Sequence, residues 1–294
     1  MVIESPQIWF RVNFIVVGNM SFEGSGASAL DDLPCRYGAS RLLMRGPART
    51  LDAPYVAVLG GTETYGKFVT NPFPALLDHS LGKDCVNLGC ANAGIDSFLN
   101  DPDILGIGAR ADLAVVQVMG AQNLNNRYYR VHPRRNDRFL EPTALLTEIY
   151  GEIDFTEFNF NKHLVCTLNR VCPSRFAVVR DELRRAWLGR MSLLLRALGP
   201  KVVLLWLRYE PHASGQSGAD LGDEPMLIDR DMLDQLADET HAIVEVQVQR
   251  AGPSGDMDGM MFGAMQAPAA EHMIGPDSHR RIAEALGRGL AGLS

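Results

Sequence analysis

Five short apolar runs, each about the length of one β-strand, most strongly constrain the fold of this chain. They are continuous stretches rich in β-branched residues, a pattern typical of strands buried on both faces of a parallel sheet. Helix-sized stretches separate them, and strand–helix alternation favours a doubly wound α/β sandwich with right-handed crossovers. We therefore predict a flavodoxin-like three-layer α/β sandwich with a mostly parallel five-stranded sheet. The runs comprise residues 55–59, 84–88, 111–119, 202–207 and 242–248.

The stretches between the runs contain the signals of the expected helices. Residues 176–198 place apolar side chains at helical spacing and end at Gly199-Pro200, a strong stop signal. Residues 71–81, 227–238 and 277–290 are also predicted to be helical. These helices would cover the faces of a doubly wound sheet.

Residues 124–174, between the third and fourth runs, depart from this alternation. They span about fifty residues, more than a normal connection in a compact domain, and their periodicity is weak. They combine a cluster of arginines with an aromatic-rich part. We expect an insertion that caps the active edge of the sheet, or alternatively a peripheral interface through which the chain forms an oligomer.

We further expect residues 20–294 to form a single domain that contains this insertion. The apolar stretch at residues 8–17 is interrupted by Arg11 and Asn13, and it is too short to span a bilayer. We interpret residues 1–19 as an N-terminal extension that precedes a natural start at Met20.

The charge and the cysteine content of the chain indicate which classes of protein it does not resemble. The formal net charge is −7, so the surface as a whole is not that of a protein that binds nucleic acid or an anionic membrane. The five cysteines are an odd number and form no Cys-x-x-Cys motif. We therefore expect reduced cysteines in a cytoplasmic protein, with neither a zinc site nor a disulfide framework.

The first apolar run ends in a glycine-rich turn that carries hydroxyl side chains. Glycines permit a sharp turn after a buried strand, and the side chain that follows them points out of the carboxyl edge of the sheet. Ligands of open parallel sheets bind at this edge. The turn places Thr62 there, and the second and third runs deliver Gly94 and the pair Gln122 and Asn123.

This turn carries a resemblance to a known family. It reads Gly-Gly-Thr-Glu-Thr-Tyr-Gly from Gly60 to Gly66 and resembles the first block of the SGNH, or GDSL, hydrolases, Gly-Asp-Ser-x-Thr-x-Gly. Gly61 stands where the family has aspartate, and Thr62 where it has the nucleophilic serine. The chain is thus similar to a divergent bacterial branch of the family. The resemblance spans about residues 55–290 and implies an SGNH-hydrolase-like fold.

The resemblance also implies catalytic roles at the carboxyl edge. Thr62 would attack an ester carbonyl and His272 would act as the base, oriented by Glu271 or by a carboxylate from residues 256–258. The extra methyl group of a threonine crowds such an attack, so a threonine that only bonds its own turn or a ligand is the alternative. The oxyanion hole would comprise the amides of Thr62 and Gly94 and the side chain of Gln122 or Asn123.

Further residues are candidates for contacts with a substrate. His279, at the start of the last predicted helix, is expected to bond backbone or ligand. Arg127, Arg130 and His132 would clamp an anionic substrate. The alternative for these three residues is a solvated basic face.

Two functions are compatible with these residues. The first is a hydrolase or acyltransferase that acts through Thr62 on an ester, such as an O-acyl group on a carbohydrate or lipid. The second is a catalytically inactive protein of the same fold that binds a glycan or an anionic ligand. Neither function requires a metal, a diffusible cofactor or nucleic acid, and neither involves a membrane span.

Overall fold

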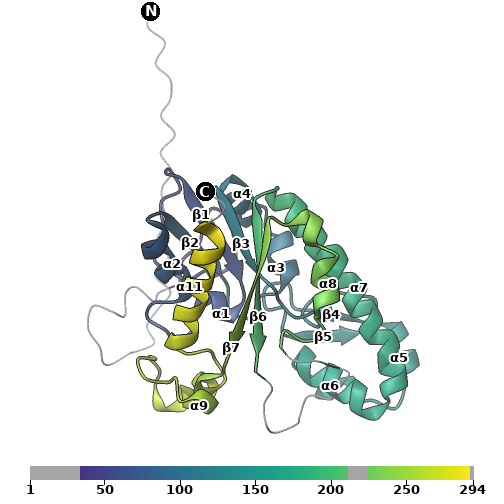
Figure 1. Ribbon diagram of the computed structural model, residues 1–294. Coiled ribbons are helices and arrows are strands. Elements are labelled where there is room, and N and C mark those ends of the chain that lie inside the picture. Colours follow the sequence, from purple (N-terminus) through teal and green to yellow (C-terminus); the bar gives the residue numbers. More distant parts are fainter. Residues whose placement is uncertain (1–33, 211–220, 222–223, 292–294) are drawn as a thin grey trace, which may run out of the picture.

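The computed structural model describes residues 34–210, 221 and 224–291, so the predicted extension 1–19 lies outside the described residues. Its centre is a five-stranded sheet with the order β2-β1-β3-β6-β7, in which every neighbouring pair is parallel (Figure 1). This is the strand order of flavodoxin-like folds, and the predicted fold class is confirmed. The strands are β1 (Tyr55–Gly60), β2 (Asp84–Gly89), β3 (Leu113–Gln117), β6 (Val202–Tyr209) and β7 (Ala242–Val248).

Alternating side chains of the central strands pack against helices on opposite faces of the sheet. On β1, Ala57 and Leu59 belong to one buried cluster, whereas Val56 and Val58 belong to the other. Because both faces are covered, all six residues of β1 are buried, which explains its continuous apolar run. Helices α3 (Ile95–Leu99), α4 (Pro102–Arg110) and α7 (Pro173–Leu198) cover the first face, and α2 (Phe73–Leu81) and α11 (Pro276–Ala291) cover the second.

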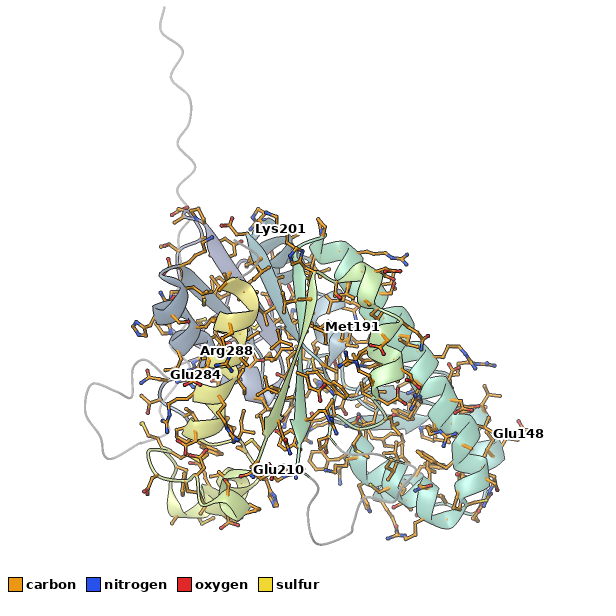
Figure 2. All side chains as sticks on the ribbon, viewed as in Figure 1. Glu148, Met191, Lys201, Glu210, Glu284 and Arg288 are labelled. Carbon is orange, nitrogen blue, oxygen red and sulfur yellow. The ribbon has the colours of Figure 1, made fainter. Side chains whose placement is uncertain are left out.

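Helix α7 illustrates how the helices are anchored. Met191 is fully buried and points from α7 into the layer between helix and sheet, whereas Glu148 on α5 (Ala144–Ile149) points into solvent (Figure 2). Trp187, also fully buried on α7, donates its indole N–H to the Met119 carbonyl at 2.7 Å, just beyond β3. The helix is therefore held to the carboxyl edge of the sheet by packing and by a buried hydrogen bond.

Between β3 and α7 the chain forms a small substructure of its own. Strands β4 (Tyr129–Val131) and β5 (Phe139–Pro142) pair antiparallel, and helices α5 and α6 (Asn161–Val171) follow, with a 3₁₀ turn, η2 (Phe155–Glu157), between them. Tyr129 is fully buried and donates its hydroxyl to the Gln122 carbonyl at 2.8 Å. This contact joins the substructure to the loop that leaves β3.

The remaining elements are short. Helix α1 (Thr62–Tyr65) follows β1, and the predicted helix over 227–238 consists of α8 (Arg230–Asp234) and the 3₁₀ turn η3 (Ala237–Glu239). Between β7 and α11 lie α9 (Ala251–Ser254), η4 (Ala264–Gln266) and α10 (Ala267–Glu271). Within the described ranges, no helix is both long and apolar enough to cross a membrane.

Candidate functional site

A buried glutamine at the end of β3 holds the turn that follows β1. The Gln117 Oε1 oxygen accepts hydrogen bonds from the Thr64 hydroxyl at 2.6 Å, from the Gly61 N–H at 3.0 Å and from the Thr64 N–H at 3.3 Å. A Cβ atom at Gly60 would overlap the Gln117 amide and the Thr64 hydroxyl, so the close approach requires glycine at this position. The turn is thus fixed from the neighbouring strand, with Thr62 as the first residue of α1.

Thr62 is bonded to the loop after β2. Its hydroxyl oxygen accepts the Asn92 N–H at 3.0 Å and donates to Asn92 Oδ1 at 3.3 Å. Asn92 adopts a left-handed backbone conformation, with φ 62°, which asparagine tolerates better than most residues. The hydroxyl of Thr62, the predicted nucleophile, therefore forms its hydrogen bonds with Asn92 and not with a histidine.

The next residue, Glu63, is held by two uncharged donors. Gln117 Nε2 donates to Glu63 Oε2 at 2.8 Å, and the Tyr209 hydroxyl donates to Glu63 Oε1 at 2.9 Å. Tyr209 is the last residue of β6. Burial and the adjacent Glu63 charge raise the pKa of Tyr209 well above its usual value, so the phenol remains a donor. These three side chains link the carboxyl ends of β1, β3 and β6.

A cavity of about 140 Å³ lies over these strand ends. It lies beside the place where the strand order reverses between β1 and β3, the position at which doubly wound sheets bind their ligands. Polar side chains dominate the lining, and no lysine, arginine or histidine lines it in the described part of the chain. The polar lining side chains are Thr62, Glu63, Asn92, Gln117, Gln122, Asn123, Asp137, Tyr209 and Glu224.

Two lining residues bury oxygens that have no hydrogen-bond partner in the part of the chain that the structure describes. Gln122 is 5% exposed and its Oε1 oxygen is unsatisfied, and so is the buried Oδ1 oxygen of Asp137. Burial raises the pKa of the Asp137 carboxyl, against the opposing charges of Arg135 and Arg138. Buried acceptors are almost always satisfied in folded proteins. The described residues also leave buried polar atoms without a hydrogen-bond partner outside the cavity, on Asp96, Arg138, Asn161, Asn169 and Trp206.

Asn123, the other amide considered for the oxyanion hole, is oriented by the insertion. Its Oδ1 oxygen accepts from Asn161 Nδ2 at 3.1 Å, and its side-chain Nδ2 has no partner among the described residues. The structure thus brings Thr62, Gln122 and Asn123 to one cavity.

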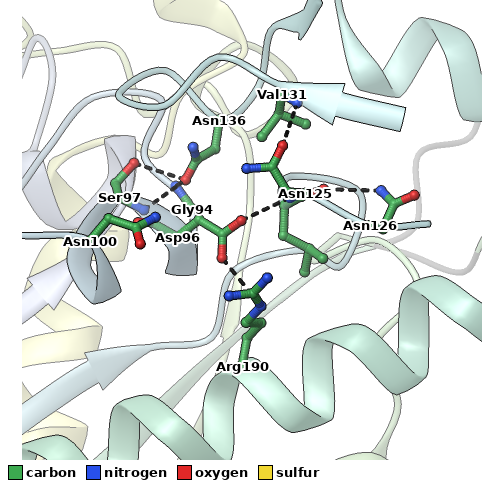
Figure 3. Close-up of polar contacts among 10 residues, drawn as sticks. Gly94, Asp96, Ser97, Asn100, Asn125, Asn126, Val131, Asn136 and Arg190 are labelled. Atoms are coloured by element: carbon green, nitrogen blue, oxygen red, sulfur yellow. Dashed lines mark hydrogen bonds and ion pairs between the residues drawn. The ribbon is translucent and has the colours of Figure 1, made fainter. Parts of the chain in front are cut away.

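Gly94 is placed differently from the expectation. Its N–H donates to Asn136 Oδ1 at 3.0 Å, and the same oxygen accepts from the Ser97 N–H at 3.0 Å and the Ser97 hydroxyl at 2.8 Å (Figure 3). Asn136 therefore caps the amino end of α3, and the Gly94 amide is already engaged. Gly94 is not among the residues that line the cavity, so the structure does not bring its amide together with Thr62 there.

The same region ties the insertion to the core. Asp96 is buried, accepts the Asn125 N–H at 2.8 Å and lies 3.7 Å from Arg190 Nε on α7 (Figure 3). Asn125 Oδ1 in turn accepts the Val131 N–H at 3.0 Å. These bonds position the loop that supplies Asn123 and Asp137 to the cavity.

His279 is a buried residue of the fold. It is 1% exposed, its Nδ1 accepts the Phe73 N–H at 3.1 Å, and its ring stacks on Phe73 at a centroid distance of 5.9 Å. Burial lowers the pKa of His279 to about 3, so the ring is neutral at ordinary pH. His279 does not line the cavity, and the structure does not bring it to the expected substrate contact.

His272, expected to be the base, is exposed at the end of α10 and does not line the cavity. The carboxylate of Asp256, one of those considered for orienting it, instead accepts the N–H groups of Asp277 at 3.0 Å and Ser278 at 3.3 Å. Asp256 therefore caps the amino end of α11, a favourable place for a negative charge. The structure does not join Thr62, His272 and a carboxylate into a triad.

The three basic residues considered for an anionic substrate lie on or beside β4, outside the cavity lining. Arg127 and Arg130 are exposed, and Arg130 donates to the Asn126 carbonyl. His132 Nδ1 accepts the Arg134 N–H at 3.2 Å and thereby shapes its own loop. The structure does not bring these side chains together with Thr62.

Sequence reasoning missed six polar side chains of the site, namely Glu63, Asn92, Gln117, Asp137, Tyr209 and Glu224. One signal was present, because Gln117 is a polar residue inside an otherwise apolar strand run. The Tyr209–Glu63 bond joins residues 146 positions apart, and no local pattern indicates it.

Comparison with known proteins assigns the chain to a family whose function is not known. A family described as "Domain of unknown function (DUF6473)" matches residues 20–294. No curated protein matches the chain. A solved structure described as a salicylyl-acyltransferase from a tetracycline biosynthetic pathway is similar at 12% identity and a TM-score of 0.35. The similarity covers 83% of this chain but only 57% of that one, and carries no argument about function.

Proposed function

Because the chain belongs to the family "Domain of unknown function (DUF6473)", we propose a function from the site itself: the cavity binds a polyhydroxylated, carbohydrate-like ligand. The observation that carries the proposal is the cavity lining, in which amide and carboxylate groups surround a small space. Sugar hydroxyls both donate and accept hydrogen bonds, and such a lining offers both kinds of partner. The volume is below the roughly 300–1,000 Å³ of drug-sized sites, so one sugar ring is a suitable occupant.

The lining supports this proposal over the binding of an anion. Glu63, Asp137 and Glu224 would repel a negatively charged ligand, and the basic residues that would attract one lie outside the lining. The glycan of the earlier binding hypothesis therefore fits the cavity better than its anionic alternative does.

Acyl transfer or ester hydrolysis through Thr62 is the second candidate. It is favoured by the position of Thr62 at the start of α1 and by the side-chain Nδ2 of Asn123, which has no partner among the described residues and belongs to a residue of the same cavity. These groups correspond to the nucleophile and an oxyanion donor of the SGNH resemblance. We rank it second because a hydroxyl nucleophile needs a base, and His272 does not line the cavity.

One experiment separates the two candidates. Binding of a methyl glucoside and release of acetate from its 6-O-acetyl ester are measured on the wild-type protein and on Gln122→Leu and Thr62→Val. For the binding function, the glucoside binds, no acetate is released, and Gln122→Leu weakens binding at least about tenfold, because it removes a buried hydrogen-bonding group. Gln247→Leu, at an exposed position on β7, is the matched control.

Acetate release would favour the second candidate if Thr62→Val abolishes it while the exposed-site variant Thr147→Val retains it. Thr62→Ser should then raise the rate, since it removes the methyl group that crowds the attacked carbon. Absence of both binding and release would contradict both candidates.

A further inference from the structure

Residues 127–138 carry positive charge that the described part of the protein does not neutralise. The segment contains five arginines and a single carboxylate, that of Asp137, in a chain whose formal net charge is −7. None of the five forms an ion pair with a described residue, whereas all six arginines of α7 do. Other basic residues without an ion pair in the described chain, such as Lys201 and Arg250, lie singly in the sequence. Free positive charge gathered on one short segment attracts an anion. The five residues are Arg127, Arg130, Arg134, Arg135 and Arg138.

The loop over residues 132–138, between β4 and β5, is the part of this segment that adjoins the cavity. Asp137 belongs to the loop and lines the cavity, and its carbonyl accepts the Asn161 N–H at 3.0 Å. The Arg138 guanidinium lies 5.3 Å from the ring centroid of Phe160, the residue before Asn161. Arg135 and Arg138 both act on the Asp137 carboxyl through their charges. These two arginines therefore lie beside the cavity wall without lining the cavity.

The loop is shaped by its own hydrogen bonds. His132 Nδ1 accepts the N–H groups of Arg134 at 3.2 Å and of Arg135 at 3.1 Å, and the Arg138 N–H donates to the Arg135 carbonyl at 2.9 Å. Asn136 Nδ2 donates to the His132 carbonyl at 2.9 Å. A loop that is already ordered loses less conformational entropy when it binds a ligand.

The cavity and the loop differ in the charge that they favour. Glu63, Asp137 and Glu224 disfavour an anion inside the cavity. Outside the lining, Arg135 and Arg138 offer planar guanidinium groups, which match the geometry of a phosphate group. A ligand that suits both regions has an uncharged, hydroxyl-bearing part and a phosphate group attached to it.

Resting on the proposed carbohydrate-binding function, we infer that the ligand is a phosphorylated sugar whose ring occupies the cavity and whose phosphate binds Arg135 and Arg138 in the loop beside it. A neutral sugar would occupy the cavity and leave the arginines without an anion. Inorganic phosphate would contact the arginines and leave the cavity empty.

Four ligands test the inference: glucose, glucose 1-phosphate, glucose 6-phosphate and inorganic phosphate. Their dissociation constants for the full chain are measured by ligand-observed NMR at about pH 7.5, where a phosphate monoester carries nearly two charges. At least one sugar phosphate should bind roughly tenfold or more tightly than both glucose and inorganic phosphate, because bonds between arginine and phosphate are charge-assisted. Added salt should reduce this difference, since it screens exposed charges.

The variant Arg135→Gln removes the charge of an exposed side chain that forms no hydrogen bond with a described residue, so it should not disturb the fold. We expect it to weaken the binding of the sugar phosphate roughly fivefold or more, and to leave the affinity for glucose within about twofold of the wild-type value. Arg127→Gln is the matched control, because it makes the same change in net charge at the end of the hairpin away from the loop. It should retain the wild-type preference.

The outcomes distinguish the inference from the function on which it rests. If glucose binds and neither sugar phosphate binds more tightly, the inference is wrong and carbohydrate binding stands. The inference is also overturned if Arg127→Gln weakens the binding of the sugar phosphate as much as Arg135→Gln does, or if inorganic phosphate alone binds as tightly as the sugar phosphates. If none of the three sugars binds, the proposed function fails and the inference fails with it.

Discussion

Two regions of the molecule, the amino end of α11 and the cavity beside β1 and β3, differ in how their polar side chains are bonded. At the amino end of α11, His279 accepts a backbone N–H and Asp256 accepts two, so both side chains have partners within the chain. In the cavity beside β1 and β3, the described residues leave one oxygen of Gln122 and one of Asp137 without a partner. The first region uses its polar groups to cap and pack a helix, whereas the second presents polar side chains to a cavity.

The comparison explains why a histidine near the expected place is not enough to identify a catalytic base. His272, the expected base, is exposed and does not line the cavity. His279, expected to bond backbone or ligand, is stacked on Phe73, and its Nδ1 accepts the Phe73 backbone N–H. A catalytic base must reach the proton that it removes. Residue type and approximate position are therefore not enough to identify a catalytic base; the contacts of the side chain decide its role.

The largest expected effect is a loss of stability when Gln117, which holds the turn at the cavity, is replaced. Gln117→Leu removes the acceptor of the Gly61 and Thr64 N–H groups and of the Thr64 hydroxyl. Each buried donor left unsatisfied costs about 1–3 kcal/mol, so the free energy of unfolding should fall by about 3 kcal/mol or more. Urea denaturation measures it. Gln247→Leu should change stability little, and an equally small effect of Gln117→Leu would show that Gln117 does not hold the turn.

The next effect concerns His279 in the α11 region and the dependence of stability on pH. Since the pKa of His279 falls from 6.5 to about 3 on folding, only the unfolded protein binds a proton at this residue between these values. The contribution of His279 to stability should therefore decrease by up to about 1.4 kcal/mol for each pH unit below 6.5. His279→Gln should flatten this part of the stability profile, measured by thermal unfolding between about pH 7 and pH 4.

His272→Gln serves as the matched control for this measurement, because His272 is exposed. It should keep the wild-type acid dependence. If His279→Gln keeps that dependence too, the buried neutral state of His279 is not a source of acid sensitivity.

The smallest expected effect is a gain in stability, in contrast to the losses above, when the Asp137 carboxyl is replaced. Burial raises the pKa of Asp137, so its ionised form is disfavoured in the folded protein, and its contribution to stability is lost as pH rises through the folded-state pKa. Asp137→Asn should therefore raise the midpoint of thermal unfolding by a few degrees at neutral pH, and the gain should shrink in acid. A fall in the midpoint at neutral pH would mean that the carboxylate stabilises the fold.

Much of the architecture followed from local patterns. The five apolar runs correspond to the five strands of the sheet, and the turn after the first run carries Thr62 to its carboxyl edge. The carboxyl ends of parallel strands meet at one edge, so Gln122 and Asn123 could be expected close to Thr62, and all three line one cavity.

Other features of the site could not be read from local patterns. The Gly94 amide is engaged by Asn136, which lies 42 residues later in the insertion. Whether Asp256 orients a histidine or caps a helix depends on the path of the chain between β7 and α11. Spacing in a sequence does not determine how such loops close, because many loop conformations satisfy the same local preferences.

The alternation of strands and helices, and the edge at which polar groups gather, can be predicted from local patterns, because burial on both sides of a parallel sheet imposes a pattern on neighbouring residues. Which of those polar groups have partners depends on tertiary contacts. His279 accepts the Phe73 N–H, and Gly94 donates to Asn136, whereas one oxygen each of Gln122 and Asp137 has no partner among the described residues. These contacts join residues far apart in the chain, so no local pattern indicates them.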